Sequence, residues 1–466
     1  MDASLGTLRT IGEAGLEGVS GVDSAVDAAR AVIAQAAGSP IAPEADPMLE
    51  QLRECAREAG GPVSARTRAS AVGERYRQMP ADERTHFMQL LAYSLGPDPK
   101  VVARAHAAYT RALGSDAQWD AESALRLAVR SPRSRLIRQF NDMPDGLKFL
   151  LDLRADVLSR LADLPGLAVL DQELQARLAS WFDVGFLDLQ RITWDSPAAL
   201  LEKLIDYEAV HQIRSWTDLK NRLDSDRRCY GFFHPRMPRE PLIFVEVALT
   251  AELSQAVQPL LDEAAPLLDP GTASAAIFYS ISNTQPGLRG ISLGNFLIKR
   301  VVEALHRDFP RLEVFSTLSP LPLFRKWLDR QFVAGTLPID PCLLEPLAQL
   351  LDVKAPACPL QRALQRTRWT ERPEVAERLQ APMQALCAHY ISEVKQGLYP
   401  YDPVARFHLA NGARVEHVNW AADISVNGFN QSYGMMVNYR YIPEQIEHNV
   451  DAYAAAGHIA LGPEMI

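Results

Sequence analysis

Three glycines lie at spacings of three and four residues in the stretch from Gln285 to Asn295. An apolar run at 275–282 precedes them, and a run with apolar residues at helical spacing, 296–306, follows. This order predicts a buried strand, a tight loop and a helix. Glycines let backbone N–H groups turn toward an anion, and the following helix adds its positive dipole end. A phosphate-binding loop is one interpretation, and a tight connection in an α/β sheet is the other.

Two further residues could carry proton chemistry. His408 lies in the stretch 406–412, which we interpret as a strand entering a turn, where a sheet can hold an imidazole rigidly. Ser319 follows a predicted strand at 312–318, and ligands bind beyond this end of the strands in open α/β sheets. Each pattern, taken alone, is also compatible with a purely structural role.

Other kinds of catalytic site find no support in the sequence. There is no Gly-x-Ser-x-Gly elbow of the kind that carries a hydrolase serine, and no His, Asp and Glu set has metal-ligand spacing. The five cysteines are far apart and form no Cys-x-x-Cys pair, which favours reduced thiols over a zinc site or a redox dithiol. We therefore expect metal-free chemistry.

Length and charge limit the partners. A chain of 466 residues is long enough for two or three domains, and a net charge of −9 argues against a general nucleic-acid binder. No apolar run reaches the ~18 residues of a membrane span. The N-terminus carries Asp2 and Glu13 where a targeting peptide would be basic. We expect a cytoplasmic protein with no nucleic-acid or membrane partner.

The composition divides the chain into three parts. Residues 1–46 are rich in Ala, Gly and Ser and predict a flexible leader. Residues 47–182 predict an all-α bundle with solvated charged faces, which we interpret as a structural or assembly domain. Its predicted helices are 49–59, 63–79, 81–95, 99–113, 120–129, 133–164 and 169–182.

Residues 183–466 alternate short strands with helices, so the whole chain is of the α/β (α+β) class. Two predicted strands, 229–233 and 242–249, are joined by a proline-bearing loop and should be antiparallel. The tail predicts strand-like pieces around two turns, Asn411-Gly412 and Asn427-Gly428.

An ordered set of segments between about residue 140 and residue 441 resembles the malonyl-CoA decarboxylase family. The segments that carry the resemblance include 151–156, 232–235, 240–242, 247–250, 279–282, 294–302, 315–322, 407–413, 419–423 and 438–441. The resemblance implies an N-terminal helical domain used in oligomer assembly, giving a homotetramer built as a dimer of dimers. It also implies a C-terminal catalytic domain with an acetyltransferase-like (GNAT-type) mixed sheet that binds acyl-CoA, with a role in fatty acid metabolism.

The same resemblance implies roles for single residues. It makes Ser319 the catalytic serine and His408 the catalytic histidine, with Tyr441 in the same site. The segment that would hold the phosphates of CoA comprises Arg289, Gly290, Ile291, Ser292, Leu293, Gly294 and Asn295. One departure stands in this segment, because some family members carry a glutamate where this chain has Ser292. The fit to the acetyltransferase loop pattern is also poor, since Gly287 falls two residues after Gln285 and not three.

The residue types agree with the implied reaction. Decarboxylation of a malonyl thioester leaves negative charge on the thioester oxygen, so a hydrogen-bond donor and a general acid can suffice without a cofactor. We expect His408 to protonate carbon, with Ser319 bonding the reacting group and sharing the proton relay. Two other functions remain open: an acyl-CoA-dependent N-acyltransferase and a non-catalytic CoA-binding sensor.

Overall fold

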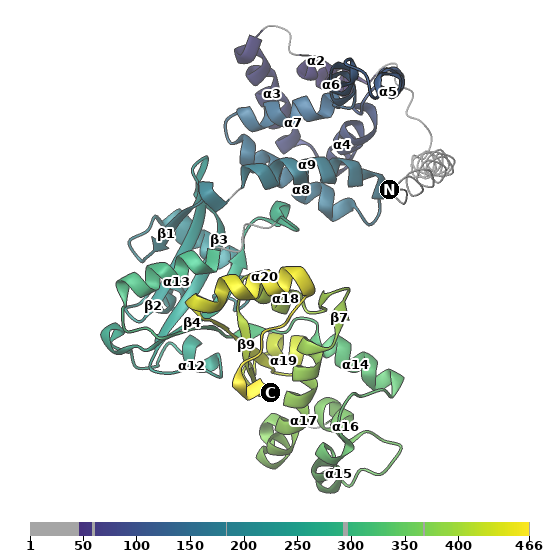
Figure 1. The fold of residues 1–466 in the computed structure, drawn as a ribbon. Helices are drawn as coiled ribbons and strands as arrows, with labels where there is room; N and C mark the ends of the chain where they lie inside the picture. Colours follow the sequence, from purple (N-terminus) through teal and green to yellow (C-terminus); the bar gives the residue numbers. More distant parts are fainter. Residues whose placement is uncertain (1–45, 58–60, 183, 292–296, 367–368, 466) are drawn as a thin grey trace, which may run out of the picture. The chain divides into compact units, whose positions relative to one another are not determined.

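The computed structural model describes residues 46–57, 61–182, 184–291, 297–366 and 369–465 (Figure 1). These residues form two compact units. The first contains the described residues up to Trp181 together with Gln285–Ile291, and the second contains the described residues of Phe182–Thr284 and those from Leu297 on. The sequence placed the boundary between residues 182 and 183. It did not foresee that the short segment Gln285–Ile291 packs with the first unit.

The first unit is helical. Its helices are α2 (Pro47–Ala56), α3 (Gly61–Gln78), α4 (Ala81–Gln89), α5 (Pro99–Ala112), α6 (Gln118–Ala128), α7 (Pro132–Asp142), α8 (Gly146–Arg160) and α9 (Ala168–Trp181). The single helix predicted at 133–164 was wrong, because the chain breaks it into α7 and α8. Pro144 disfavours helical backbone in the residue before it, and Asp145 then adopts a left-handed conformation with φ 50°.

A repeated two-residue signal starts three of these helices. Asp46, Asp98 and Ser131 each precede a proline, and each side chain accepts hydrogen bonds from backbone N–H groups of the first helical turn. Proline fits the first helical position because it has no N–H to leave unpaired and its φ is already helical. The predicted starts of these helices agree with the structure to within two residues.

Buried arginines tie the first unit together. Arg154 on α8 pairs with Asp171 on α9 at 2.8 Å and donates to the carbonyl of Gly287 at 2.6 Å. Gly287 lies so close to α8 that a Cβ atom there would come within 2.1 Å of the carbonyl oxygen of Leu151. The glycine is therefore required for the segment Gln285–Ile291 to pack against α8.

An eight-stranded mixed sheet forms the centre of the second unit. Its path runs β1-β2-β3-β4-β5-β10-β6, with β9 on the other side of β10. The strands are β1 (Asp188–Ile192), β2 (Arg227–His234), β3 (Met237–Thr250), β4 (Ala275–Asn283), β5 (Val314–Thr317), β6 (Ser319–Pro320), β9 (Arg414–Asn419) and β10 (Met436–Tyr441). Strands β2 and β3 are antiparallel, as predicted, and the prediction of a mixed sheet after a helical domain is confirmed.

The parallel pairing of β4 with β5 is short. It runs from Ala275 opposite Val314 to Phe278 opposite Thr317. A register shift in the β3–β4 pairing follows at once, and β4 then continues to Asn283 with β3 as its partner. Strand β5 ends at the same point, and the next strand, β6, pairs with β10 and not with β4. The sheet therefore divides just beyond Thr317, beside the position of Ser319.

Helices connect and cover the strands of this unit. They are α10 (Ala198–Tyr207), α11 (Trp216–Arg222), α12 (Gln258–Leu261), α13 (Leu297–Asp308), α14 (Phe324–Ala334), α15 (Glu345–Leu351), α16 (Pro359–Arg366), α17 (Pro373–Ser392), α18 (Pro403–Ala410), α19 (Val426–Ser432) and α20 (Ile446–Ala456). A two-stranded ribbon pairs β7 (Lys395–Gln396) with β8 (Tyr399–Pro400). Helix α13 packs on the sheet (Figure 1), with Arg300 over the ring of Phe232 and His306 against Phe315.

One predicted turn in the tail was wrong. Asn427-Gly428 lies inside α19, which Ser425 caps by accepting a hydrogen bond from the N–H of Gly428 at 3.1 Å. A serine three residues before that glycine was the competing signal, and it starts a helix. Gly412, by contrast, has φ 84° and forms the predicted turn.

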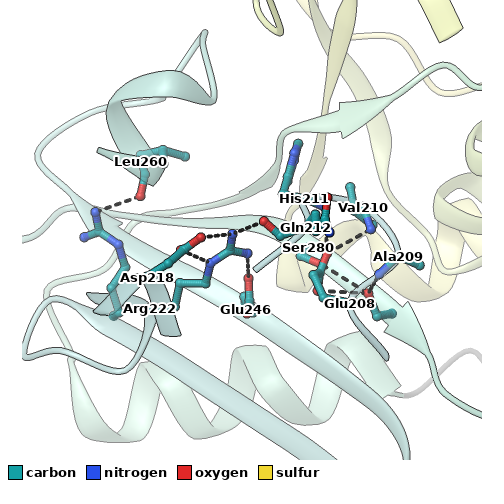
Figure 2. Close-up of polar contacts among 12 residues, drawn as sticks. Glu208, Ala209, Val210, His211, Gln212, Asp218, Arg222, Glu246, Leu260 and Ser280 are labelled. Carbon is teal, nitrogen blue, oxygen red and sulfur yellow. Dashed lines mark hydrogen bonds and ion pairs between the residues drawn. The ribbon is translucent and has the colours of Figure 1, made fainter. Parts of the chain in front are cut away.

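A cluster of charged side chains lies buried beside β3 and β4 (Figure 2). Arg222 on α11 bonds Asp218 at 2.8 Å and Glu246 at 3.0 Å, and all three side chains are at most 2% exposed. Next to them the carboxylate of Glu208 accepts hydrogen bonds from the hydroxyls of Ser280 and Ser282. Burial raises the pKa of Glu246 to about 8 despite the arginine beside it.

Among the residues that the structure describes, no helix is long and apolar enough to cross a membrane.

Candidate active site

Three residues far apart in the sequence form one hydrogen-bonded row in the second unit. The Oγ atom of Ser319 lies 3.0 Å from Nε2 of His408, and Nδ1 of His408 lies 2.8 Å from the hydroxyl of Tyr441. All three side chains are buried. The structure thus brings together the three residues that the sequence nominated for catalysis. We call them the serine–histidine–tyrosine row.

Adjacent strands of the sheet position two members of the row. Ser319 on β6 pairs with Val437 on β10, and Tyr441 ends β10 beside β5. Backbone pairing within a sheet fixes side chains more precisely than a loop can. Ser319 is therefore held at the place where the sheet divides.

His408 reaches the row from a helix, and the predicted strand at 406–412 was wrong. Helix α18 begins after Asp402, whose carboxylate accepts hydrogen bonds from the N–H groups of Val404 and Ala405 at 2.9 and 3.1 Å. Pro403 occupies the first helical position. Asp-Pro is the same start signal that opens α2 and α5, and it overrides the strand-like composition of the stretch. His408 lies in the last turn of α18.

The capping carboxylate is itself buried and held from a second side. The hydroxyl of Tyr390 on α17 donates to Asp402 at 3.2 Å. Burial raises the pKa of Asp402 to about 6, although its hydrogen bonds to the backbone act in the opposite direction. The helix that carries His408 is thus anchored to α17 through one carboxylate.

Aromatic side chains enclose the imidazole. The ring of Tyr439 stacks on His408 with a centroid distance of 4.7 Å and an interplanar angle of 22°. Tyr439 and Tyr441 are two residues apart on β10 and so point to the same face of the sheet. The sequence analysis missed Tyr439, and this spacing of two was the signal that could have found it.

Burial determines the charge of the site. It lowers the pKa of His408 to about 3 and raises that of the Tyr441 hydroxyl. At neutral pH the row therefore consists of a neutral imidazole with one N–H and two neutral hydroxyls. Such a set can donate and accept hydrogen bonds and transfer one proton without building up charge.

We expect His408 to stay neutral as the pH is lowered from 8 to 5. Its folded-state pKa lies below the ~6.5 of an unfolded chain, so acid protonates the unfolded state first, and this histidine reduces stability as the pH falls below 6.5. Nitrogen-15 NMR of the histidine rings, with the His408→Asn variant for assignment, measures the charge directly. A protonation midpoint near 6.5 would contradict the buried, neutral imidazole.

The predicted phosphate-binding segment is only partly described. Arg289, Gly290 and Ile291 belong to the first unit, and Gly290 has φ 75°. The carbonyl of Gly290 accepts a hydrogen bond from the Gln175 side chain at 3.0 Å. The other four predicted residues, Ser292, Leu293, Gly294 and Asn295, lie outside the described residues.

No group of three or more His, Cys, Asp or Glu side chains that could hold a metal ion occurs among the described residues.

Comparison with known proteins agrees with the resemblance seen in the sequence. Residues 185–465 match the malonyl-CoA decarboxylase C-terminal domain, and residues 95–182 match the N-terminal domain of that family. The chain is 37% identical to the mitochondrial malonyl-CoA decarboxylase of Anser anser anser over 422 residues, which cover 87% of this chain and 84% of the relative. It is 36% identical to that of Rattus norvegicus, with 83% and 82% covered.

Solved structures agree as well. The crystal structure of malonyl-CoA decarboxylase from Rhodopseudomonas palustris matches with a TM-score of 0.81 and 42% identity, covering 90% of this chain and 98% of that one. The structure from Agrobacterium vitis matches with a TM-score of 0.81 and 38% identity, with the same coverage. The similarity extends over both the helical region and the sheet region, and the chain therefore belongs to the malonyl-CoA decarboxylase family.

Proposed function

We propose that this protein decarboxylates malonyl-CoA to acetyl-CoA and carbon dioxide. The observation that carries the proposal is the serine–histidine–tyrosine row, a buried and neutral proton-transfer site within the region that matches the family's C-terminal domain. In the reaction the bond between the α-carbon and the carboxylate breaks, and carbon dioxide leaves. The electron pair moves into the thioester as an enolate, which then takes a proton at carbon. Because the thioester carbonyl can hold the electron pair, the proposed reaction needs no cofactor.

The row supplies a proton donor and a proton relay for these reaction steps. His408 protonates the α-carbon, and Ser319 bonds the reacting group and shares the relay. Tyr441, at 2.8 Å from the far nitrogen of the imidazole, returns a proton to the ring after each turnover and takes its own proton back from solvent, so that each turnover consumes one solvent proton. A general acid placed in this way contributes about 10²–10⁴-fold to a rate. The enclosing burial excludes water that would otherwise compete for hydrogen bonds with the enolate.

Incubation with malonyl-CoA, with and without an acceptor amine, tests the function. Release of carbon dioxide with acetyl-CoA in the absence of an amine is the expected result. Acyl transfer that depends on the amine would instead assign an N-acyltransferase. Binding of malonyl-CoA without any turnover would assign a CoA-binding sensor.

We further propose that residues 289–295 hold the phosphates of CoA through backbone N–H groups. The left-handed backbone of Gly290, with φ 75°, supports this, because such a conformation turns successive N–H groups toward one side. A β-branched residue cannot adopt it without strain.

Replacing Gly290 with valine should therefore weaken CoA binding by ~10-fold or more, whereas Ser292→Ala should change it by less than about three-fold. Isothermal titration calorimetry with CoA measures both. The reverse order of effects would show that side chains and not the backbone bind the phosphates.

The domain of residues 47–182 is proposed to assemble the protein, with the catalytic domain at 183–466. Helices α5 and α6 support this proposal, because neither contains a buried residue although they pack against each other. Their exposed apolar side chains include Trp119, which is 72% exposed, and Leu127. An exposed amphipathic hairpin of this kind is typical of an interface.

Charge favours a second copy of the same hairpin as the partner. Helix α5 carries Lys100, Arg104 and Arg111 and no acidic residue, while α6 carries two acids, Asp120 and Glu122, and one arginine, which pairs with Glu122. Two hairpins related by a two-fold axis would place the basic helix of one copy against the acidic helix of the other. We propose a homotetramer built from dimers, in the cytoplasm, with this hairpin forming one of its interfaces.

Trp119→Glu should then lower the particle mass in solution, because it places a charge in the apolar centre of that interface. Light scattering measures the mass. Val333→Glu on α14, which replaces a side chain that is 90% exposed in the other unit, is the matched control and should leave the mass unchanged. An unchanged mass for the Trp119 variant would exclude the hairpin as an interface.

A further inference from the structure

A third hydroxyl extends the serine–histidine–tyrosine row as its fourth member. Oγ1 of Thr317 accepts a hydrogen bond from Oγ of Ser319 at 2.9 Å and a second one from the backbone N–H of Tyr439 at 3.1 Å. Thr317 is fully buried at the end of β5. Its hydroxyl oxygen thus serves as the acceptor for two donors, one of which is the nominated catalytic serine.

A side chain of the neighbouring strand β10 fixes the strand that carries Thr317. The side-chain amide of Asn438 donates to the carbonyl of Thr317 at 2.7 Å and to that of Ser254 at 3.1 Å. Its oxygen accepts a hydrogen bond from the amide of Asn419 at 2.7 Å. Asn438 is fully buried, so this network positions the Thr317 backbone without competition from water.

Each of these groups has a limited number of protons, and this determines which atom donates and which accepts in every hydrogen bond of the row. A serine hydroxyl has one proton, and Ser319 gives it to Thr317 until the reacting group takes it. The 3.0 Å contact between Ser319 and His408 must therefore use a proton on Nε2 of the imidazole. A neutral imidazole has only one N–H, so its Nδ1 is an acceptor and receives the hydroxyl proton of Tyr441.

From this order we infer that Thr317 is a positioning residue that fixes His408 as the Nε2–H tautomer. The inference rests on the proposed function, because it assigns a purpose to the row proposed to protonate the substrate. With Thr317 as the terminal acceptor, the N–H of the imidazole points to Ser319, where the sheet divides. Every proton in the row then points away from Tyr441 and toward Thr317.

Loss of the threonine oxygen should reverse the direction in which the hydrogen bonds of the row donate. Ser319 would then donate to Nε2 of His408, because no other acceptor for its proton is bonded to it in the row. The imidazole proton would move to Nδ1 and point to Tyr441. In that state neither ring nitrogen presents a proton beside Ser319, and the proton donor is turned away from the site of reaction.

Thr317→Val removes the oxygen and keeps the shape of the side chain, and Thr317→Ser keeps the oxygen and removes the methyl group. Ser316→Ala is the matched control, because its neighbouring buried hydroxyl bonds backbone carbonyls and not the row. The steady-state rate of malonyl-CoA decarboxylation and nitrogen-15 NMR of the His408 ring are measured for each variant.

We expect Thr317→Val to lower kcat by about ten-fold with KM nearly unchanged, as loss of one oriented hydrogen bond would. The ring spectrum should move from the Nε2–H to the Nδ1–H tautomer. Thr317→Ser should restore both kcat and the tautomer, and Ser316→Ala should alter neither.

Two results would overturn the inference: an Nδ1–H tautomer in the unaltered protein, or an unchanged tautomer in Thr317→Val. The spectra do not depend on turnover. If the unaltered protein failed to decarboxylate malonyl-CoA, the proposed function would fall while the tautomer measurement would still decide the role of Thr317 in the row.

Discussion

His408→Asn should lower kcat for malonyl-CoA decarboxylation by ~10²-fold or more and leave the affinity for CoA within about two-fold. Asparagine can keep a hydrogen bond to Ser319 or to Tyr441, but it cannot transfer a proton to carbon. Ser319→Ala should cause a loss of similar size, because it removes the hydroxyl that bonds the imidazole and that we propose to bond the reacting group.

The comparison of kcat with binding separates chemistry from folding. His458→Asn, the same change at an exposed histidine, is the control and should retain full activity. Calorimetry with CoA shows whether each variant is folded and competent to bind. Near-normal turnover in His408→Asn or in Ser319→Ala would remove that residue from the proposed mechanism.

The largest effect on stability is expected from Arg222→Met. The guanidinium lies between Asp218 and Glu246, and none of the three side chains is more than 2% exposed (Figure 2). Without the arginine, the Asp218 carboxylate would lose its buried cation, and Glu246, whose pKa is already raised to about 8, would lose a hydrogen-bond donor. We expect a loss of about 3–5 kcal/mol in the free energy of unfolding, since breaking a buried ion pair from one side leaves an uncompensated charge.

Denaturant unfolding followed by fluorescence measures this loss. Arg214→Met is the matched control, because Arg214 also pairs with Asp218, at 3.6 Å, but is 70% exposed. An exposed pair contributes less than about 1 kcal/mol. Equal losses in the two variants would show that burial of the Arg222 cluster does not determine its contribution.

The sequence predicted the class of the fold because its strongest signals are local. Helical periodicity placed most helices between Pro47 and Trp181 within a few residues, although α7 and α8 were predicted as one helix. The Asp402-Pro403 signal that starts α18 is also local, yet the stretch that carries His408 was predicted as a strand. Alternating apolar residues in 404–409 favoured a strand. The stretch is nevertheless helical, because Asp402 caps a helix that begins there.

Some residues of the site could be predicted from the sequence, and others could not. Ser319, His408 and Tyr441 could be nominated through the family resemblance, because they lie in distinctive motifs. Thr317 could not, because its role depends on which strands lie side by side. Strand β10 pairs with both β5 and β6, and no local pattern encodes that arrangement. The packing of Gln285–Ile291 with the helical unit is non-local in the same sense.

Deuterium from the solvent shows whether the row protonates a thioester enolate at carbon. Malonyl-CoA is incubated briefly with the protein in heavy water, and carbon dioxide and acetyl-CoA are quantified together with the deuterium content of the methyl group. We expect equal amounts of the two products, one deuterium in the new methyl group, and a rate at least ~10²-fold lower with His408→Asn. Acetyl-CoA formed without deuterium, or at an undiminished rate by the variant, would contradict protonation at carbon by His408.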